Sequence, residues 1–161
     1  MALLEKQRQL FGAHHYYACD PFHENKPPIK GDKYLQNVGK AISEMYTAFD
    51  SQAVWVMQAW SLREPIVKAV DKDKLLILDI DGSKCEKTDG FWGYNFISGT
   101  LNNFGDRNTL HGSIDALAEN KFMEEREKYP SIVGTGLFME GIFQNPLYFD
   151  LASDMLTRSD K

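Results

Sequence analysis

The stretch that decides the fold is YYACDPFHENKPP, Tyr16–Pro28. An apolar and aromatic run stops at Asp20, and His23 and Glu24 follow before a proline pair ends any regular structure. This pattern predicts a β-strand that carries polar groups to the rim of a sheet. In α/β proteins the reacting groups gather at that rim, at the carboxyl ends of the strands.

The remaining sequence alternates between helical and extended patterns. Apolar residues recur at three- and four-residue steps over residues 33–49, which predicts an amphipathic helix. The run Leu75–Leu78 is continuously apolar and predicts a strand buried on both faces. Further helices are predicted at residues 2–11, 62–70 and 113–120 and from Pro146, with Asn145 as N-cap, and further strands at residues 16–19, 53–57, 94–105 and 131–140.

Strands that alternate with helices are expected to be parallel and joined by right-handed crossovers. Polar or aromatic residues follow several of these strands, which favours a (β/α)8 barrel over a doubly wound sheet, because a barrel builds its active site at those strand ends. About five strands are visible where a barrel needs eight. We therefore expect residues 1–161 to form an α/β fold that is the C-terminal portion of a (β/α)8 TIM-type barrel.

Composition sets broader limits. With 161 residues, of which 43% are hydrophobic, the chain can bury a sizeable core. The net charge of −5 argues against nucleic acid or an anionic membrane as partner. No apolar run approaches the roughly 18 residues of a membrane span, and the N-terminus does not resemble a signal peptide. Cys19 and Cys85 lack the spacing of a zinc site or of a disulfide framework.

Two carboxylates stand out at the predicted strand ends. Glu24 follows the first strand and Glu140 ends the last, so a curved sheet could bring them face to face. Two carboxyl groups, one protonated and one ionised, are the minimum equipment of most glycosidases. The segments WVMQAW and FWGYNF supply aromatic side chains on which a sugar ring could stack. Alternatively, both glutamates are ordinary strand-end acids.

Five motifs in order resemble those of the α-N-acetylglucosaminidases, glycoside hydrolase family 89. They are YYACDPFHE, AVWVMQAW, LLILDI, GTLNNFGDRNTLHG and VGTGLFMEGIFQNPLYFDL, and they extend from about Leu10 to Met155. The resemblance implies release of terminal α-linked N-acetylglucosamine from glycans such as heparan sulfate, with retention of configuration and without metal or other cofactor. It implies a lysosomal or a secreted or periplasmic enzyme. The flanking N-terminal and C-terminal helical domains of the family are expected to be absent here, and nothing indicates an oligomeric state.

The resemblance also implies site residues. Glu24 matches the family's acid/base and Glu140 its nucleophile. Trp60, which matches a wall of the sugar pocket, and Asn103, which matches the asparagine of the N-F-G turn, are the substrate-binding residues that the resemblance implies. The chain departs from the family pattern immediately before Asn103 and in the segment DIDGSKCEK, where contacts around the sugar are expected to differ.

Two alternatives remain. LLILDIDGS resembles the first motif of haloacid-dehalogenase-like phosphatases, in which Asp79 would be the nucleophile and Asp81 the acid/base beside Mg²⁺. However, other strands precede the motif, which should open its domain. The chain could also be an inactive fragment, because an open portion of a barrel exposes strand edges and apolar interior surface.

Overall fold

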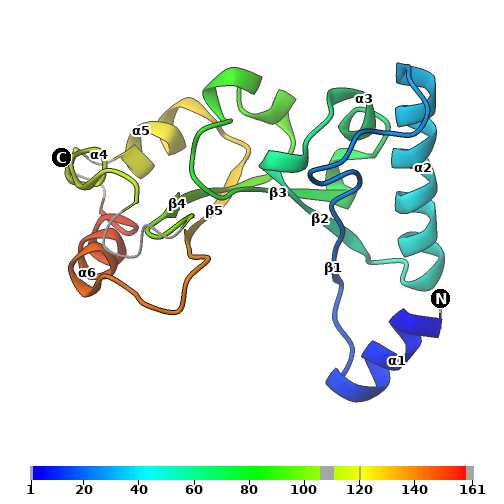
Figure 1. Cartoon of the computed structure of the whole chain (residues 1–161), viewed down its shortest axis with the longest axis horizontal. Helices are drawn as coiled ribbons and strands as arrows, with labels where there is room; N and C mark the ends of the chain where they lie inside the picture. The colour runs from blue at the N-terminus through cyan, green and yellow to red at the C-terminus, as the bar shows by residue number, and fades with distance from the viewer. Residues whose placement is uncertain (1, 106–110, 120, 159–161) are drawn as a thin grey trace. The chain divides into compact units, whose positions relative to one another are not determined.

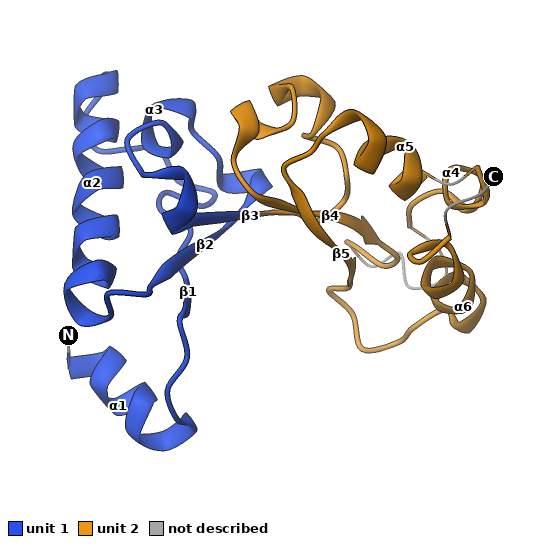
Figure 2. Cartoon of the chain, turned by 180° about the vertical axis from the view of Figure 1, so that it is seen from behind, with its two compact units in different colours: residues 1–76 blue, residues 77–161 orange. Residues whose placement is uncertain are grey.

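The computed structural model describes residues 2–105, 111–119 and 121–158 (Figure 1). The chain forms two compact units, residues 1–76 and residues 77–161 (Figure 2). Each unit contains parallel strands connected by helices, and strands that pair within a unit follow each other in the chain. No helix within the described residues has the length and apolar character needed to cross a membrane.

The first unit contains a parallel strand pair. β1 lies opposite β2, with Tyr16 facing Val54 and Ala18 facing Val56. Because the pair is parallel, both strands end at the same edge. The elements of this unit are α1 (Ala2–Phe11), β1 (Tyr16–Ala18), α2 (Asp32–Phe49), β2 (Val54–Gln58), η1 (Ala59–Ser61), α3 (Glu64–Val67) and η2 (Lys72–Lys74).

Aromatic side chains of the strands form much of the core of this unit, and two of its helices approach each other closely. Tyr17 of β1 stacks on Tyr46 of α2 with ring centroids 5.1 Å apart. Trp55 is buried and donates its indole N–H to the Cys19 carbonyl at 2.7 Å. Gly39 lets α2 approach α3, because a Cβ at this position would lie 2.5 Å from the Ile66 carbonyl oxygen.

Among its described residues, the second unit contains two strand pairings. The end of β3 pairs with β4, with Ile77 opposite Phe96, and β4 pairs with β5 as far as Leu101 opposite Phe138. Both pairings are parallel. The elements are β3 (Leu75–Asp79), η3 (Glu86–Thr88), η4 (Phe91–Gly93), β4 (Phe96–Leu101), α4 (Ile114–Ala118), α5 (Lys121–Lys128), β5 (Ile132–Phe138) and α6 (Pro146–Met155).

Apolar side chains on the helices of this unit form one cluster. Leu117 of α4, Phe122 of α5 and Tyr148 of α6 are almost completely buried together with Ala152. A second contact joins Phe91 to Phe96, whose ring centroids lie 4.8 Å apart.

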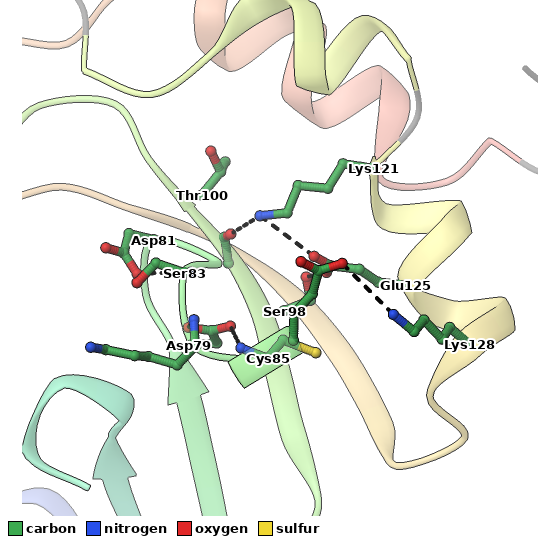
Figure 3. A network of polar contacts seen from close by, with 12 residues as sticks. Asp79, Asp81, Ser83, Cys85, Ser98, Thr100, Lys121, Glu125 and Lys128 are labelled. Carbon is green, nitrogen blue, oxygen red and sulfur yellow. Dashed lines mark hydrogen bonds and ion pairs between the residues drawn. The ribbon is translucent and has the colours of Figure 1, made fainter. Parts of the chain in front are cut away.

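A partly buried polar network lies beside the strands of this unit (Figure 3). The Ser98 hydroxyl donates to the Glu125 carboxylate. The Lys121 ammonium donates to the Gly99 carbonyl at 3.2 Å and lies 3.7 Å from the same Glu125 carboxylate. The charged groups of α5 therefore reach the backbone and side chains of β4.

Asp79, at the end of β3, belongs to this network and has no solvent exposure. Its two carboxylate oxygens accept hydrogen bonds from the backbone N–H groups of Lys84 at 3.3 Å and Cys85 at 3.0 Å. Burial raises the pKa of Asp79 to about 6, although those two hydrogen bonds and the Lys121 charge act in the opposite direction.

The predicted alternation of helices with parallel strands is confirmed. So is Asn145 as the N-cap of α6, since its side chain accepts a hydrogen bond from the Tyr148 N–H at 3.2 Å. The helix predicted over residues 62–70 is limited to α3, and β4 and β5 are shorter than predicted. The prediction of residues 113–120 as a helix holds for Ile114–Ala118, while residue 120 lies outside the described residues.

Two predictions from periodicity were wrong or incomplete. β3 is not buried on both faces: Leu75, Ile77 and Asp79 are buried, whereas Leu76 and Leu78 are partly exposed, because the described residues cover only one face fully. α5 was missed. Its sequence KFMEEREK buries only Phe122 completely and therefore lacks an apolar stripe.

The close approach at Gly39 gives a first prediction. Gly39→Ala removes a flexible residue from a helix interior, which by itself should stabilise the helix. Here the new methyl group must displace the backbone of α3, so we expect a net loss of about 1–3 kcal/mol in the free energy of unfolding. Urea unfolding checks this. Lys40→Ala, at an exposed position of the same helix, should change stability by less than about 0.5 kcal/mol, and equal effects of both variants would contradict the prediction.

Asp79 gives a second prediction. Its pKa is higher in the folded chain, about 6, than its ordinary value of 3.8, so the folded state binds the proton more tightly. The stabilisation from this bound proton is fully present below pH 3.8 and is lost as the pH rises through about 6. The pKa difference corresponds to about 3 kcal/mol in the free energy of unfolding. We expect Asp79→Asn to abolish this dependence, measured by hydrogen exchange of β4 amides between about pH 4 and 7. Asp150→Asn, which alters an exposed carboxylate of the same unit, should retain it. An unchanged slope in Asp79→Asn would contradict the assignment.

Candidate active site

The segment after β1 forms a tight turn that presents Glu24. The Asp20 side chain accepts a hydrogen bond from the Gln58 N–H at 2.7 Å, which ties the end of β1 to the end of β2. Phe22 and Glu24 adopt φ values of 59° and 55°, in the left-handed region that L-residues seldom occupy. Such strained backbone is common at functional sites. The turn leaves the Glu24 side chain 86% exposed.

His23 connects this turn to the end of β2. Its Nδ1 lies 2.6 Å from the hydroxyl of Ser61, which is buried, and its Nε2 lies 4.0 Å from a Glu24 carboxylate oxygen. The Arg63 guanidinium also donates to the Asn25 carbonyl at 3.1 Å. The turn is thus held by contacts with the residues that follow β2.

The carboxyl group of Asp20 lies at the start of the same turn. Burial raises the pKa of Asp20, while the hydrogen bond from the Gln58 N–H and the charge of His23 act to lower it. The group therefore serves as a backbone acceptor in a partly desolvated position, where its loss would leave the Gln58 N–H without this partner.

Glu24 and Trp60 line one pocket of about 290 Å³ in the first unit, together with Phe22, Ser61 and Arg63 among others. Trp60 lies in η1, directly after β2. Trp55, from the same sequence motif, is instead a core residue with 1% exposure. The predicted sugar-stacking residue and the predicted acid/base therefore lie at one site.

Glu140 and Asn103 lie together in the second unit, at the ends of the paired strands β5 and β4. Glu140 is exposed and follows the last residue of β5, Phe138, after Met139. Asn103 is 1% exposed, and its side-chain oxygen accepts hydrogen bonds from the N–H groups of Glu140 and Gly141, both at 2.8 Å. The structure thus places Asn103 against the backbone that carries Glu140.

The four predicted residues form two groups, Glu24 with Trp60 and Glu140 with Asn103. The first group belongs to the first unit and the second to the second unit. The approach of Glu24 to Glu140 across a shared glycosidic bond stays a prediction.

The sequence places His23 next to Glu24, but neither His23 nor Ser61 was assigned a catalytic or substrate-binding role from the sequence. Nothing in the sequence signals the contact of His23 with a serine 38 positions later.

The phosphatase alternative is not supported. Its nucleophile would be Asp79, which is completely buried and has both carboxylate oxygens engaged by loop amides. Asp81 accepts a hydrogen bond from the Ser83 N–H at 3.1 Å. Across the described part of the chain, no group of at least three histidine, cysteine, aspartate or glutamate residues could hold a metal ion. The D-x-D-G-S sequence serves here to fold the loop after β3.

Comparisons with known proteins identify the family of the chain. The family model described as the alpha-N-acetylglucosaminidase (NAGLU) tim-barrel domain matches residues 1–159. Human alpha-N-acetylglucosaminidase is 32% identical over 166 aligned residues, which cover 93% of this chain and 22% of the human protein.

Solved structures of a family 89 glycoside hydrolase from Clostridium perfringens are also similar. Its complex with PUGNAc is 28% identical with a TM-score of 0.84 and covers 97% of this chain and 18% of that one. A form with two glutamates replaced by glutamine, in complex with its substrate GlcNAc-alpha-1,4-galactose, is 26% identical with a TM-score of 0.83 and the same coverage. This chain therefore spans about a fifth of the length of these relatives. Because the family model matches almost every residue, the chain belongs to the alpha-N-acetylglucosaminidase TIM-barrel family.

Proposed function

We propose that this chain carries both catalytic carboxylates of a retaining glycoside hydrolase that releases terminal α-linked N-acetylglucosamine. The observation that supports this most directly is the pocket in which Glu24 lies beside Trp60, on a turn with strained backbone. Membership of the family supports the substrate class. In the Clostridium relative, two glutamates are replaced in the substrate complex, and they are separated along that sequence by nearly as many residues as separate Glu24 from Glu140 here.

In the first step, Glu140 attacks the anomeric carbon while Glu24 donates a proton to the departing glycosidic oxygen. The carbon–oxygen bond to the leaving group breaks, and an ester between Glu140 and the sugar forms. In the second step, the Glu24 carboxylate takes a proton from water, whose oxygen attacks the same carbon. This frees the sugar and restores both side chains. Two inversions give net retention, which requires carboxyl groups about 5–5.5 Å apart.

The neighbours of these carboxylates have distinct tasks in this mechanism. Trp60 offers an apolar ring face to the C–H groups of the sugar. His23 lies between Ser61 and Glu24, so the Ser61 contact fixes the orientation of the ring that faces the acid/base. We expect the 161-residue chain alone to turn over slowly, because both glutamates are exposed in it and efficient glycoside hydrolysis needs a site that excludes water.

Glu140→Ala tests the nucleophile. The variant is made in a polypeptide that carries this segment within a complete family barrel, and hydrolysis of an aryl α-N-acetylglucosaminide is measured. We expect turnover to fall to near background, because no ester can form. Added azide should restore product formation by occupying the vacated space, with a glycosyl azide of inverted configuration as the product. Turnover equal to that of the unmodified protein would exclude Glu140 as nucleophile, and Glu44→Gln, at an exposed helix position, is the control.

Glu24→Gln tests the acid/base. We expect the rate of the first step to fall by about 100- to 10,000-fold for a substrate whose leaving group needs protonation. For a substrate whose aryl leaving group departs readily as an anion, the rate should fall much less, because departure of that group needs no proton. Comparison of kcat/KM for the two substrates measures this difference. An equal loss for both would contradict the assignment, and Glu44→Gln should alter neither.

A further inference from the structure

We propose that Asn103 is the positioning residue for Glu140: its buried side-chain amide clasps the backbone of the loop 139–144 and thereby fixes where the nucleophile stands. This inference rests on the proposed function and assigns Asn103 a different role from the sugar contact expected from the family resemblance.

The loop that carries Glu140 needs such support because apolar packing supplies little. The described structure assigns no helix or strand between β5 and α6. Its apolar side chains face outward: Met139 is 47% exposed, Ile142 87% and Phe143 69%. A loop with few buried apolar contacts is normally among the less stable parts of a protein. Its position must therefore come mainly from polar contacts.

Asn103 supplies four of these contacts from one side chain. Its oxygen accepts from the N–H groups of Glu140 and Gly141, both at 2.8 Å. Its nitrogen donates to the carbonyls of Gly141 at 3.1 Å and Phe143 at 2.7 Å. All four partners are backbone groups, so the clasp holds the path of the chain at Glu140 and over the three residues that follow it.

Two further side-chain amides brace the clasp. Gln144 donates to the Gly141 carbonyl at 2.5 Å. Its side-chain oxygen accepts from the side-chain nitrogens of Asn102 at 3.0 Å and Asn103 at 3.4 Å. The backbone N–H of Asn102 also donates to the Phe138 carbonyl at 3.3 Å, which continues the β4–β5 pairing. The pairing of β4 with β5 therefore also fixes the position of the loop that follows β5.

The hydrogen-bonding capacity of Asn103 is fully used by the loop. A primary amide offers two N–H donors and an oxygen with two lone pairs. Both lone pairs and both donors have backbone partners, and the side chain is 1% exposed. No donor or acceptor is left for a sugar hydroxyl. A misplacement of about 1 Å in a reacting group can cost about 100-fold in rate, so a clasp on the nucleophile loop has a kinetic consequence.

The kinetic test uses Asn103→Asp and Asn103→Ala in a complete family barrel that carries this segment. In Asn103→Asp, the aspartate side chain would keep an acceptor oxygen but set a second oxygen against the Gly141 and Phe143 carbonyls, whereas Asn103→Ala removes all four backbone contacts and the contact with Gln144. We expect kcat to fall by about 100-fold for Asn103→Ala and comparably for Asn103→Asp, for readily departing and slowly departing aryl groups alike. The Kd of a competitive N-acetylglucosamine-type inhibitor should change less than about threefold, since the amide makes no sugar contact. Weakened inhibitor binding with unchanged kcat would overturn the proposal and make Asn103 a sugar contact.

Asn145→Ala is the matched control. It removes a side-chain amide just after the loop 139–144, where Asn145 is the N-cap of α6, and so lowers stability without removing any contact of the clasp. We expect its folded fraction to retain kcat. If Asn145→Ala lowers kcat as much as Asn103→Ala does, the effect is one of general stability and the proposal fails.

A second measurement does not depend on turnover. In the 161-residue chain itself, hydrogen exchange of the Glu140 and Gly141 amides should be slow, should accelerate by about tenfold or more in Asn103→Ala, and should stay slow in Asn145→Ala. Fast exchange in the unmodified chain would overturn the clasp. Normal turnover in Asn103→Ala, combined with an inactive Glu140→Ala, would overturn the positioning role alone. Normal turnover in Glu140→Ala would overturn the proposed function first.

Discussion

Parallel strand pairing is the constraint on which the candidate site depends. In each unit it brings the carboxyl ends of consecutive strands to one edge. Parallel pairing alone is therefore enough to bring residues that are distant in sequence close together there. In the first unit this places the turn of Glu24 beside Trp60, which follows β2. In the second it places Asn103 beside the loop of Glu140. The helices between the strands make this possible, since a parallel connection must cross back over the sheet.

The same local device recurs at these strand ends. A polar side chain after one strand accepts a hydrogen bond from the backbone at the end of the next: Asp20 from Gln58, and Asn103 from Glu140. Asp79 uses its carboxylate similarly, but on the loop that follows its own strand. Backbone groups that leave a sheet need partners when they are buried. A short amide or carboxylate at each strand end meets that need and also fixes the loop that follows.

The order of helices and strands could be predicted because the periods of the apolar residues are clear. α5 could not, since one buried phenylalanine and a charged surface leave no stripe. For the candidate site, residue types at strand ends indicated Glu24 and Glu140, and the family resemblance implied Trp60 and Asn103. The contacts of Asn103 could not be predicted, because they join its side chain to backbone groups as far as 40 residues away. Every residue type has a backbone carbonyl, so the amino-acid sequence does not indicate such partners.

The two aspartates of D-x-D-G-S show why a motif needs its structural setting. A phosphatase nucleophile must reach a phosphorus atom from outside, and the carboxylate of Asp79 is sealed beneath its own loop. Glu24 has the opposite setting: it is exposed, lies beside an aromatic side chain at a pocket and stands on backbone that is costly to maintain. Strain of about 1–3 kcal/mol at each such residue lowers stability and persists only where surrounding contacts enforce it. Here the Asp20–Gln58 and His23–Ser61 contacts enforce it, so the turn that presents Glu24 is maintained by the residues around it and does not follow from the conformational preference of its own sequence.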